Sequence, residues 1–195
     1  MEHINRQFTV NDSNYEENYY LNILTRRKEG QYTLYMNGIL LIIQEYRDGV
    51  LHGTLREFYP SGIQKLVAQY RNGKKEGKYV TYYDNGRENV VCNILDTMLY
   101  GKYIKYYRDG RKNVVCWYNI NNGKSVLHGP FFKYYGNGNP ETVTGYIENK
   151  LHGGYHSWYM DGNKRCEGKY INGEMVNYNI YYKDNGRKEV VNSKI

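Results

Sequence analysis

Histidine is the first residue type to consider, because three of the five histidines recur in one short motif and could bind a metal ion. His52, His128 and His152 each stand in a Leu-His-Gly step. If each motif belongs to a two-strand unit, even His128 and His152 lie about 9–10 Å apart by strand spacing. Zinc holds its ligands at about 2 Å, so these side chains cannot share one ion. His156 has no acidic ligand nearby in sequence, and we predict no metal site.

The cysteines are the next candidates for chemistry. Cys92 and Cys116 are 24 residues apart, which in a sheet of two-strand units separates them by about 9–10 Å, too far for a disulfide. Cys166 has no Cys-x-x-Cys partner. We predict that all three are free thiols, packed as small apolar side chains.

The sequence contains none of the common catalytic motifs. It has no GxGxxG between a strand and a helix, no GxxxxGK[ST] and no GxSxG. Acidic residues recur, but at turn positions, where their side chains cap the local backbone; they are Asp84, Asp109, Asp161 and Asp184. We therefore predict a protein that is not an enzyme, with no catalytic, cofactor-binding or metal-binding residues.

The secondary structure that carries these residues can be predicted from a repeat in the sequence. Residues 77–86 read GKYVTYYDNG, an alternation of aromatic and β-branched residues that ends in a hairpin-turn sequence. Five of the six steps between equivalent turn glycines are 24 residues long, and the step from 110 to 138 is 28. A fixed period of this length indicates a repeat array. The turn glycines are Gly38, Gly62, Gly86, Gly110, Gly138, Gly162 and Gly186.

Each repeat reads as two strands and two turns, which leaves no room for a crossover helix. We predict an all-β fold: an elongated, single-layer, twisted antiparallel meander of about seven 24-residue β-hairpin repeats. Residues 1–28 read as a degenerate N-terminal cap repeat and residues 29–195 as the repeat array. The four additional residues fall within residues 119–126, where we expect a longer polar loop at one edge.

Two aromatic columns recur across the repeats. One stands three residues before the turn glycine and includes Tyr83, Tyr107, Tyr135 and Tyr159. The other stands one residue earlier and includes Trp158. Because neighbouring strand residues point to opposite faces, we expect the two columns on opposite sides of the sheet.

The longest apolar run, residues 39–43, has five residues, far too few for a transmembrane helix. Residues 1–14 contain no apolar segment that could serve as a secretory signal. We expect a protein that is neither secreted nor transmembrane and that resides in a reducing compartment such as the cytoplasm.

The motifs resemble the MORN repeat, and more closely the variant form found in YwqK-like antitoxin proteins and in proteins of large DNA viruses. The resemblance rests on the segment 70–73 (Tyr-Arg-Asn-Gly), on Gly77, on the segment 82–86 (Tyr-Tyr-Asp-Asn-Gly) and on the Leu-His-Gly steps. It covers roughly residues 29 to 195. It implies an elongated antiparallel sheet that serves as a scaffold and contact surface, in some relatives at membranes.

Our leading hypothesis is a structural or interaction protein that binds a protein partner or a larger assembly, because a single layer cannot hide aromatic residues on both faces. The predicted partner-binding residues are Tyr83, Tyr107, Tyr135, Tyr159 and Trp158. Many Asn, Lys, Ile and Tyr residues, together with the resemblance, suggest a viral protein and a virion component. Open edge strands offer a route to homo-oligomers.

The net charge of +7 supports an alternative, a module that binds acidic membrane lipid peripherally or binds nucleic acid, the latter being less favoured. The cations considered for it are Arg26, Arg27, Lys28, Lys74, Lys75, Lys105 and Lys133. A third alternative, suggested by the resemblance alone, is an antitoxin-like neutraliser of a toxin.

Overall fold

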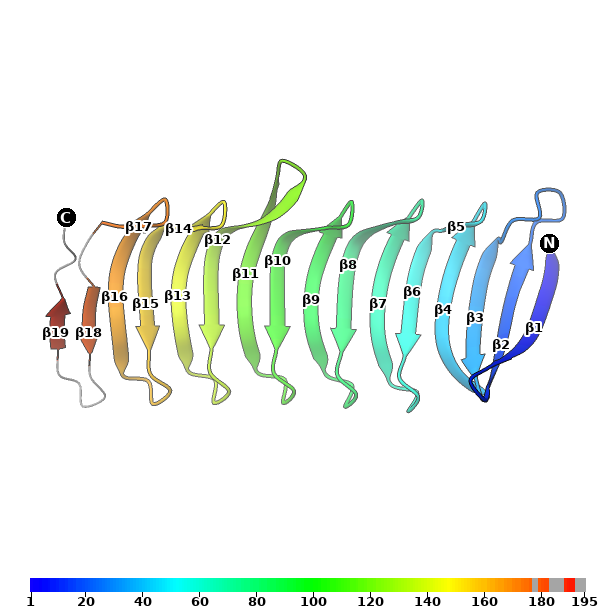
Figure 1. The fold of residues 1–195 in the computed structure, drawn as a ribbon, viewed down its shortest axis with the longest axis horizontal. Helices are drawn as coiled ribbons and strands as arrows, with labels where there is room; N and C mark the ends of the chain where they lie inside the picture. The colour runs from blue at the N-terminus through cyan, green and yellow to red at the C-terminus, as the bar shows by residue number, and fades with distance from the viewer. Residues whose placement is uncertain (177–178, 183–187, 192–195) are drawn as a thin grey trace. The chain divides into compact units, whose positions relative to one another are not determined.

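The computed structural model describes residues 1–176, 179–182 and 188–191, with side chains through residue 176. The chain divides into two compact units, Met1–Thr97 and Met98–Ile195, which are described separately. Every element within the described residues is a β-strand (Figure 1). The predicted turns at Asp184 and Gly186 lie outside the described residues.

Unit 1, Met1–Thr97, is a meander of nine strands in chain order, and each strand other than the short β5 pairs antiparallel with the next full-length strand. The two-residue β5 precedes β6, and both pair with β4. The strands are β1 (Glu2–Val10), β2 (Ser13–Leu21), β3 (Gly30–Met36), β4 (Ile39–Arg47), β5 (Val50–Leu51), β6 (Gly53–Phe58), β7 (Gln64–Arg71), β8 (Lys74–Tyr82) and β9 (Glu88–Leu95).

Unit 2, Met98–Ile195, follows the same plan. Its short strands β14 and β17 repeat the arrangement of β5. The strands are β10 (Met98–Tyr106), β11 (Lys112–Asn121), β12 (Lys124–Tyr134), β13 (Pro140–Ile147), β14 (Lys150–Leu151), β15 (Gly153–Trp158), β16 (Lys164–Ile171), β17 (Glu174–Met175), β18 (Asn179–Tyr182) and β19 (Lys188–Val191). The prediction of an all-β, single-layer antiparallel meander of hairpins is confirmed for both units.

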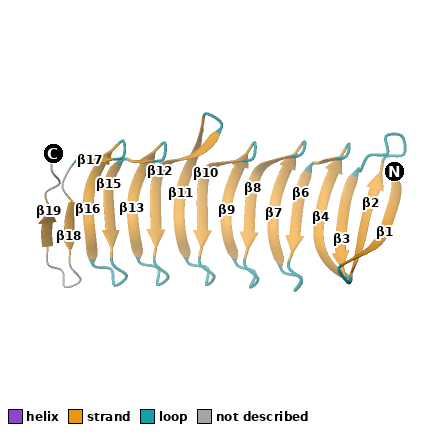
Figure 2. Ribbon diagram, viewed as in Figure 1, coloured by secondary structure: helices purple, strands orange, loops and turns teal. Residues whose placement is uncertain are grey.

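The turns differ between the two edges of each unit (Figure 2). On one edge, two-residue turns such as Asn72-Gly73 have positive φ at both residues, 49° and 81°, the type I′ geometry that matches strand twist. On the other edge of unit 1, the turns at Asn11-Asp12 and Asn37-Gly38 also have two residues with positive φ. From Tyr59 on, the corresponding described turns of both units have three residues and follow a tyrosine: the Gly62 N–H donates to the Tyr59 carbonyl at 2.8 Å, and Gly62 has φ 81°. Only the last residue of such a turn requires the left-handed conformation, so the glycine repeated from Gly62 on is a steric requirement of this turn.

The additional residues of the long repeat do not form the predicted polar loop. They lengthen β11 to ten residues and β12 to eleven, and a two-residue turn at Asn122-Gly123 still closes the hairpin. Figure 1 shows this hairpin projecting beyond its neighbours. Paired additions on both strands preserve the register, because neither strand gains a residue without a partner.

Packing within the single layer is lateral, between side chains of neighbouring strands. In unit 1, Ala68 of β7 pairs with Leu55 of β6 and with Tyr79 of β8, and it is only 1% exposed. Cys92 of β9 pairs with Tyr79 on its other side and is also buried. Large and small residues therefore alternate across the strands, so that each small side chain is covered by its large neighbours.

The same alternation appears in unit 2, where Cys116 lies between Tyr103 and Phe131, and Thr144 follows Phe131. Cys116 and Thr144 are both buried. All three cysteines are free and buried, which confirms the prediction. Burial raises the pKa of the Cys92 and Cys116 thiols to about 11, because a thiolate loses its hydration in this environment.

Candidate interaction surface

The predicted tyrosines do not lie on strand faces; they begin the three-residue turns. In the turn after β10, the Tyr107 N–H donates to the Arg111 carbonyl at 2.8 Å, and the Gly110 N–H donates to the Tyr107 carbonyl at 2.9 Å. Tyr83, Tyr135 and Tyr159 occupy the same place in their turns. The expectation that this column lies on one side of the sheet, opposite the column that includes Trp158, is therefore wrong, because the strand alternation stops at the residue before it.

The tyrosine hydroxyls reach across to the next repeat. In unit 2, the Tyr107 hydroxyl donates to the Tyr134 carbonyl at 2.7 Å, and the Tyr135 hydroxyl donates to the Trp158 carbonyl at 2.9 Å. In unit 1, the Tyr59 hydroxyl donates to the Tyr82 carbonyl at 2.8 Å. Each bond joins residues more than 20 positions apart, so the column fastens one hairpin to the next.

Trp158 is the last residue of β15, where a register shift separates it from Ser157. Its ring lies near the imidazole of His156, with ring centroids 6.1 Å apart, and Tyr135 bonds to its carbonyl. The structure thus brings Tyr135 and Trp158 together in unit 2, with Tyr159 following in the next position. All three side chains are half-buried.

Sequence reasoning missed several apolar side chains that are more exposed than these tyrosines. Met160, in the turn that Tyr159 begins, is 56% exposed. At the opposite edge of unit 2, Ile147 and Ile171 directly precede two-residue turns and are 38% and 43% exposed. Their position next to a turn could have predicted their exposure from the sequence, because a residue at the end of a strand is covered by a neighbouring strand on at most one side.

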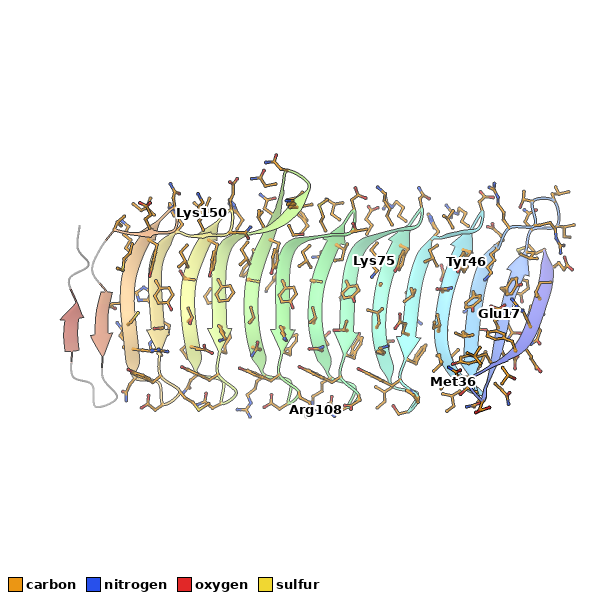
Figure 3. The ribbon with its side chains drawn as sticks, viewed as in Figure 1. Glu17, Met36, Tyr46, Lys75, Arg108 and Lys150 are labelled. Carbon is orange, nitrogen blue, oxygen red and sulfur yellow. The ribbon has the colours of Figure 1, made fainter. Side chains whose placement is uncertain are left out.

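Figure 3 distinguishes the two edges of unit 2 by Arg108, at the three-residue turns, and Lys150, at the two-residue turns. Across unit 2, a second feature is an open hollow of about 400 Å³ on one sheet face. It is lined by Glu141, Thr142, Leu151, Tyr155, Ser157, Arg165, Cys166 and Tyr170.

Two of the three histidines of the Leu-His-Gly steps lie near turn asparagines. His52 Nδ1 is 3.3 Å from Asn72 Oδ1, and the Asn172 N–H donates to His152 Nδ1 at 3.5 Å. His128 lies within β12 and is exposed. Across the described ranges, no three His, Cys, Asp or Glu side chains converge as a metal site would require.

Most of the cations considered for an anionic partner have local partners instead. Lys74 pairs with Asp96, and Lys133 with Glu141, each at 2.6 Å. The hydrogen bond to Glu141 raises the pKa of Lys133. Arg26 pairs with Glu2. Lys75 Nζ lies 5.3 Å from the Tyr79 ring centroid. Lys105 and Arg27 are exposed.

The sequence matches no protein-family model and no curated protein. In the part of the chain that the structure describes, no helix has the length and apolar character needed to cross a membrane.

Proposed function

We propose that the protein is a non-enzymatic interaction scaffold that binds a protein partner through the aromatic edge formed by its three-residue turns. One observation carries the proposal: among the described residues, a sheet this rich in aromatic residues buries only nine apolar side chains. They are Tyr32, Leu55, Leu66, Ala68, Val80, Cys92, Val115, Cys116 and Cys166. The remaining aromatic surface is available for contact, and tyrosine and tryptophan are the residue types favoured at protein interfaces.

The contact surface in unit 2 comprises Tyr107, Tyr135, Tyr159, Trp158 and Met160. The hydroxyl bonds of Tyr107 and Tyr135 hold their rings in fixed orientations. A rigid aromatic side chain loses little conformational entropy on binding, so fastening it favours affinity. In unit 1, Tyr83 occupies the equivalent turn position.

The resemblance to variant MORN repeats supports the same proposal, since it implies a scaffold made of hairpin repeats. Within it we propose a viral protein that is a component of a virion, on the residue composition and the resemblance together. An antitoxin-like role would use the same surface with a toxin as partner.

The alternative of an acidic lipid or nucleic-acid module is less well supported, because partners within the chain occupy most of the cations it needs. A cation that stays in an ion pair within the protein neutralises no phosphate, so fewer counterions are released from the nucleic acid on binding. We expect liposome and filter-binding titrations to show no steep dependence on salt, whereas a steep dependence would favour this alternative.

The proposal is tested by site-specific photo-cross-linking in extracts of the native source. A photoreactive residue replaces Met160 at the proposed surface, and in a matched control it replaces Ile171 at the opposite edge. We expect one protein to be captured from Met160 and not from Ile171. Capture of the same proteins at equal yield from both positions would rule out the aromatic edge as the contact.

The purified partner then gives a quantitative test. Met160→Asp is expected to weaken binding about tenfold or more, because it places a charge at the centre of an apolar contact. Ile171→Asp is the matched control and leaves the affinity unchanged.

A further inference from the structure

Three tyrosines of unit 1 surround one ammonium group. Lys28 Nζ lies 4.4 Å from the ring centroid of Tyr32, 4.5 Å from that of Tyr19 and 5.3 Å from that of Tyr46. The three rings come from strands β2, β3 and β4. Distances within about 6 Å of a ring centroid are those of cation–π interactions. We call this group of three rings the tyrosine cage.

The cage has the walls of a cation site. The Tyr19 and Tyr32 rings are 6.2 Å apart and inclined by only 27°, while the Tyr46 ring is 6.1 Å from Tyr32 at 72°. Two nearly parallel rings and one steep ring therefore face the same point. Lys28 Nζ lies over all three rings, and it is the electron-rich ring face, not the positive ring edge, that attracts a cation.

Hydrogen bonds hold two of the rings in place. The Tyr32 hydroxyl donates to Glu17 Oε2 at 3.1 Å, and Gln44 Nε2 donates to the Tyr46 hydroxyl at 2.8 Å. Glu17 and Tyr46 are both labelled in Figure 3, in the N-terminal part of unit 1. The Glu17 carboxylate, which also pairs with Arg6 at 3.5 Å, lies next to the cage, and a carboxylate there favours a cation over a neutral ligand.

The chemistry of the cage fits a quaternary ammonium group better than a lysine. Lysine carries three N–H donors, yet among residues 1–176 Lys28 Nζ has only ring faces as partners. A compact ammonium is strongly hydrated, so placing it among rings costs solvation that they do not replace. A trimethylammonium group has no N–H donors, and its methyl groups fill ring-to-nitrogen distances of this size.

Lys28 can leave the cage without unfolding its loop. Its backbone carbonyl accepts a hydrogen bond from the Gly49 N–H at 2.8 Å. The backbone of Lys28 also forms an isolated antiparallel β-bridge with the backbone of Leu21. The Asn22 N–H donates to the Arg27 carbonyl at 2.9 Å. The backbone is thus fixed on both sides, and rotation of the four-carbon side chain alone would empty the cage.

We propose that Tyr19, Tyr32 and Tyr46, with Glu17 beside them, form a binding site for quaternary ammonium ligands that Lys28 occupies in the free protein. A ligand enters by displacing the Lys28 side chain into solvent. The site is independent of the aromatic edge proposed above as a protein contact, and no bond is formed or broken on binding.

The test uses choline as the probe and its neutral isostere, in which carbon replaces nitrogen, as the control ligand. Calorimetric titration of the Lys28→Ala protein is expected to give a dissociation constant on the order of 1 mM for choline. The isostere should bind about tenfold more weakly or not at all. Equal binding of the two compounds would overturn the proposal, because a merely apolar pocket does not discriminate them.

Two further titrations locate the site. The protein with native Lys28 should bind choline about tenfold more weakly than Lys28→Ala, because the resident side chain competes. The double variant Lys28→Ala/Tyr46→Ala should lose choline binding. Binding that survives the loss of Tyr46, or that is unchanged by Lys28, would place the ligand elsewhere and refute the cage.

A measurement on the native chain covers the case in which these variants do not fold. Ring currents from three tyrosines should shift the Lys28 side-chain methylene resonances upfield, and choline should move them back toward the values of an exposed lysine. Resonances that stay upfield at saturating choline would show that Lys28 permanently fills the cage.

Discussion

Two residues of unit 1 occupy equivalent places in the first two repeats after the cap, yet they are buried by different chemistry. Tyr32 and Leu55 each stand two residues after a glycine that pairs with a tyrosine, and each is 8% exposed. Leu55 pairs with Ala68, an apolar neighbour. Tyr32 pairs with Gln44 and hydrogen-bonds to Glu17.

The difference shows that one backbone pattern accepts two kinds of packing. The second, regular repeat stabilises its large residue by lateral apolar contact, which is not directional. The first repeat stabilises Tyr32 by a hydrogen bond to a carboxylate and by the ammonium of Lys28, which depend on exact positions and on charge. We therefore expect the two regions to respond differently to substitution and to pH.

Loss of apolar volume should have the largest effect. Leu55→Ala is expected to lower the free energy of unfolding by about 2–5 kcal/mol, because it removes a buried side chain and leaves a cavity beside Ala68. Denaturant unfolding followed by circular dichroism measures it. A loss under about 1 kcal/mol would mean that the sheet collapses around the site, and that lateral packing does not dominate the regular repeats.

Removal of one hydroxyl should separate the two regions most clearly. Tyr32→Phe is expected to cost about 1.5–3 kcal/mol, the usual range for a hydrogen bond to a charged group. The matched control is Tyr79→Phe in the regular repeat, because the Tyr79 hydroxyl has no hydrogen-bond partner within residues 1–176, and it should be nearly neutral. If denaturant unfolding gave the same loss of stability for Tyr32→Phe and Tyr79→Phe, the proposed difference between the two kinds of packing would be wrong.

Alkaline pH should weaken both regions, but from different starting points. Burial raises the pKa of Cys92 in the regular repeat from 9.0 to about 11, so its contribution is full below pH 9 and is lost as the pH rises to about 11. Burial and then Glu17 raise the pKa of Tyr32 above its ordinary value of 10.0, so its contribution starts to fall only above pH 10. The melting temperature, measured from pH 8 to 11.5, should fall as the pH rises. In Cys92→Ala this fall should begin at a higher pH, and in Tyr32→Phe only the part of the fall above pH 10 should become smaller. If the melting temperature of Cys92→Ala depended on pH as that of the unsubstituted protein does, ionisation of Cys92 would not be the cause of the alkaline loss of stability.

An exposed ion pair should give the smallest effect. Lys74→Ala removes the pair with Asp96, whose side chains are 65% and 53% exposed, and is expected to cost less than about 1 kcal/mol. The same denaturant assay at low and high salt serves as the check, with the small loss disappearing at high salt. A loss that persists at high salt would show that the alkyl chain of Lys74, not its charge, stabilises the turn.

The period of the glycines was sufficient to predict the strands, their antiparallel order and the edge at which each turn lies. Such local features are fixed by steric rules that act within a few residues: Gly86 has φ 81° at the end of its turn, and the alternation of residues 77–82 favours a strand. The free, buried state of Cys92 followed as well, because it depends only on strand spacing. The division into residues 1–28 and 29–195 and the resemblance to MORN repeats stay predictions.

The contacts that define the candidate sites could not be predicted in this way. The column that contains Tyr107 was assigned to a strand face, whereas its hydroxyl bonds to a carbonyl 27 residues away, in the next repeat. The polar insertion was expected as a loop, whereas it extends β11 and β12. In both cases the outcome depends on where the strand pairing stops, which the residue pattern does not specify.

For this protein, the sequence alone determined the repeating hairpin, because turn sterics and side-chain alternation are properties of neighbouring residues. Tertiary structure alone determined which side chains meet across strands. The tyrosine cage needs Tyr19, Lys28, Tyr32 and Tyr46 to converge from three strands and a connection, and that convergence follows from the register of β2, β3 and β4. Cation–π and hydrogen-bond energies depend on distances of a few ångströms, and only the assembled sheet sets those distances.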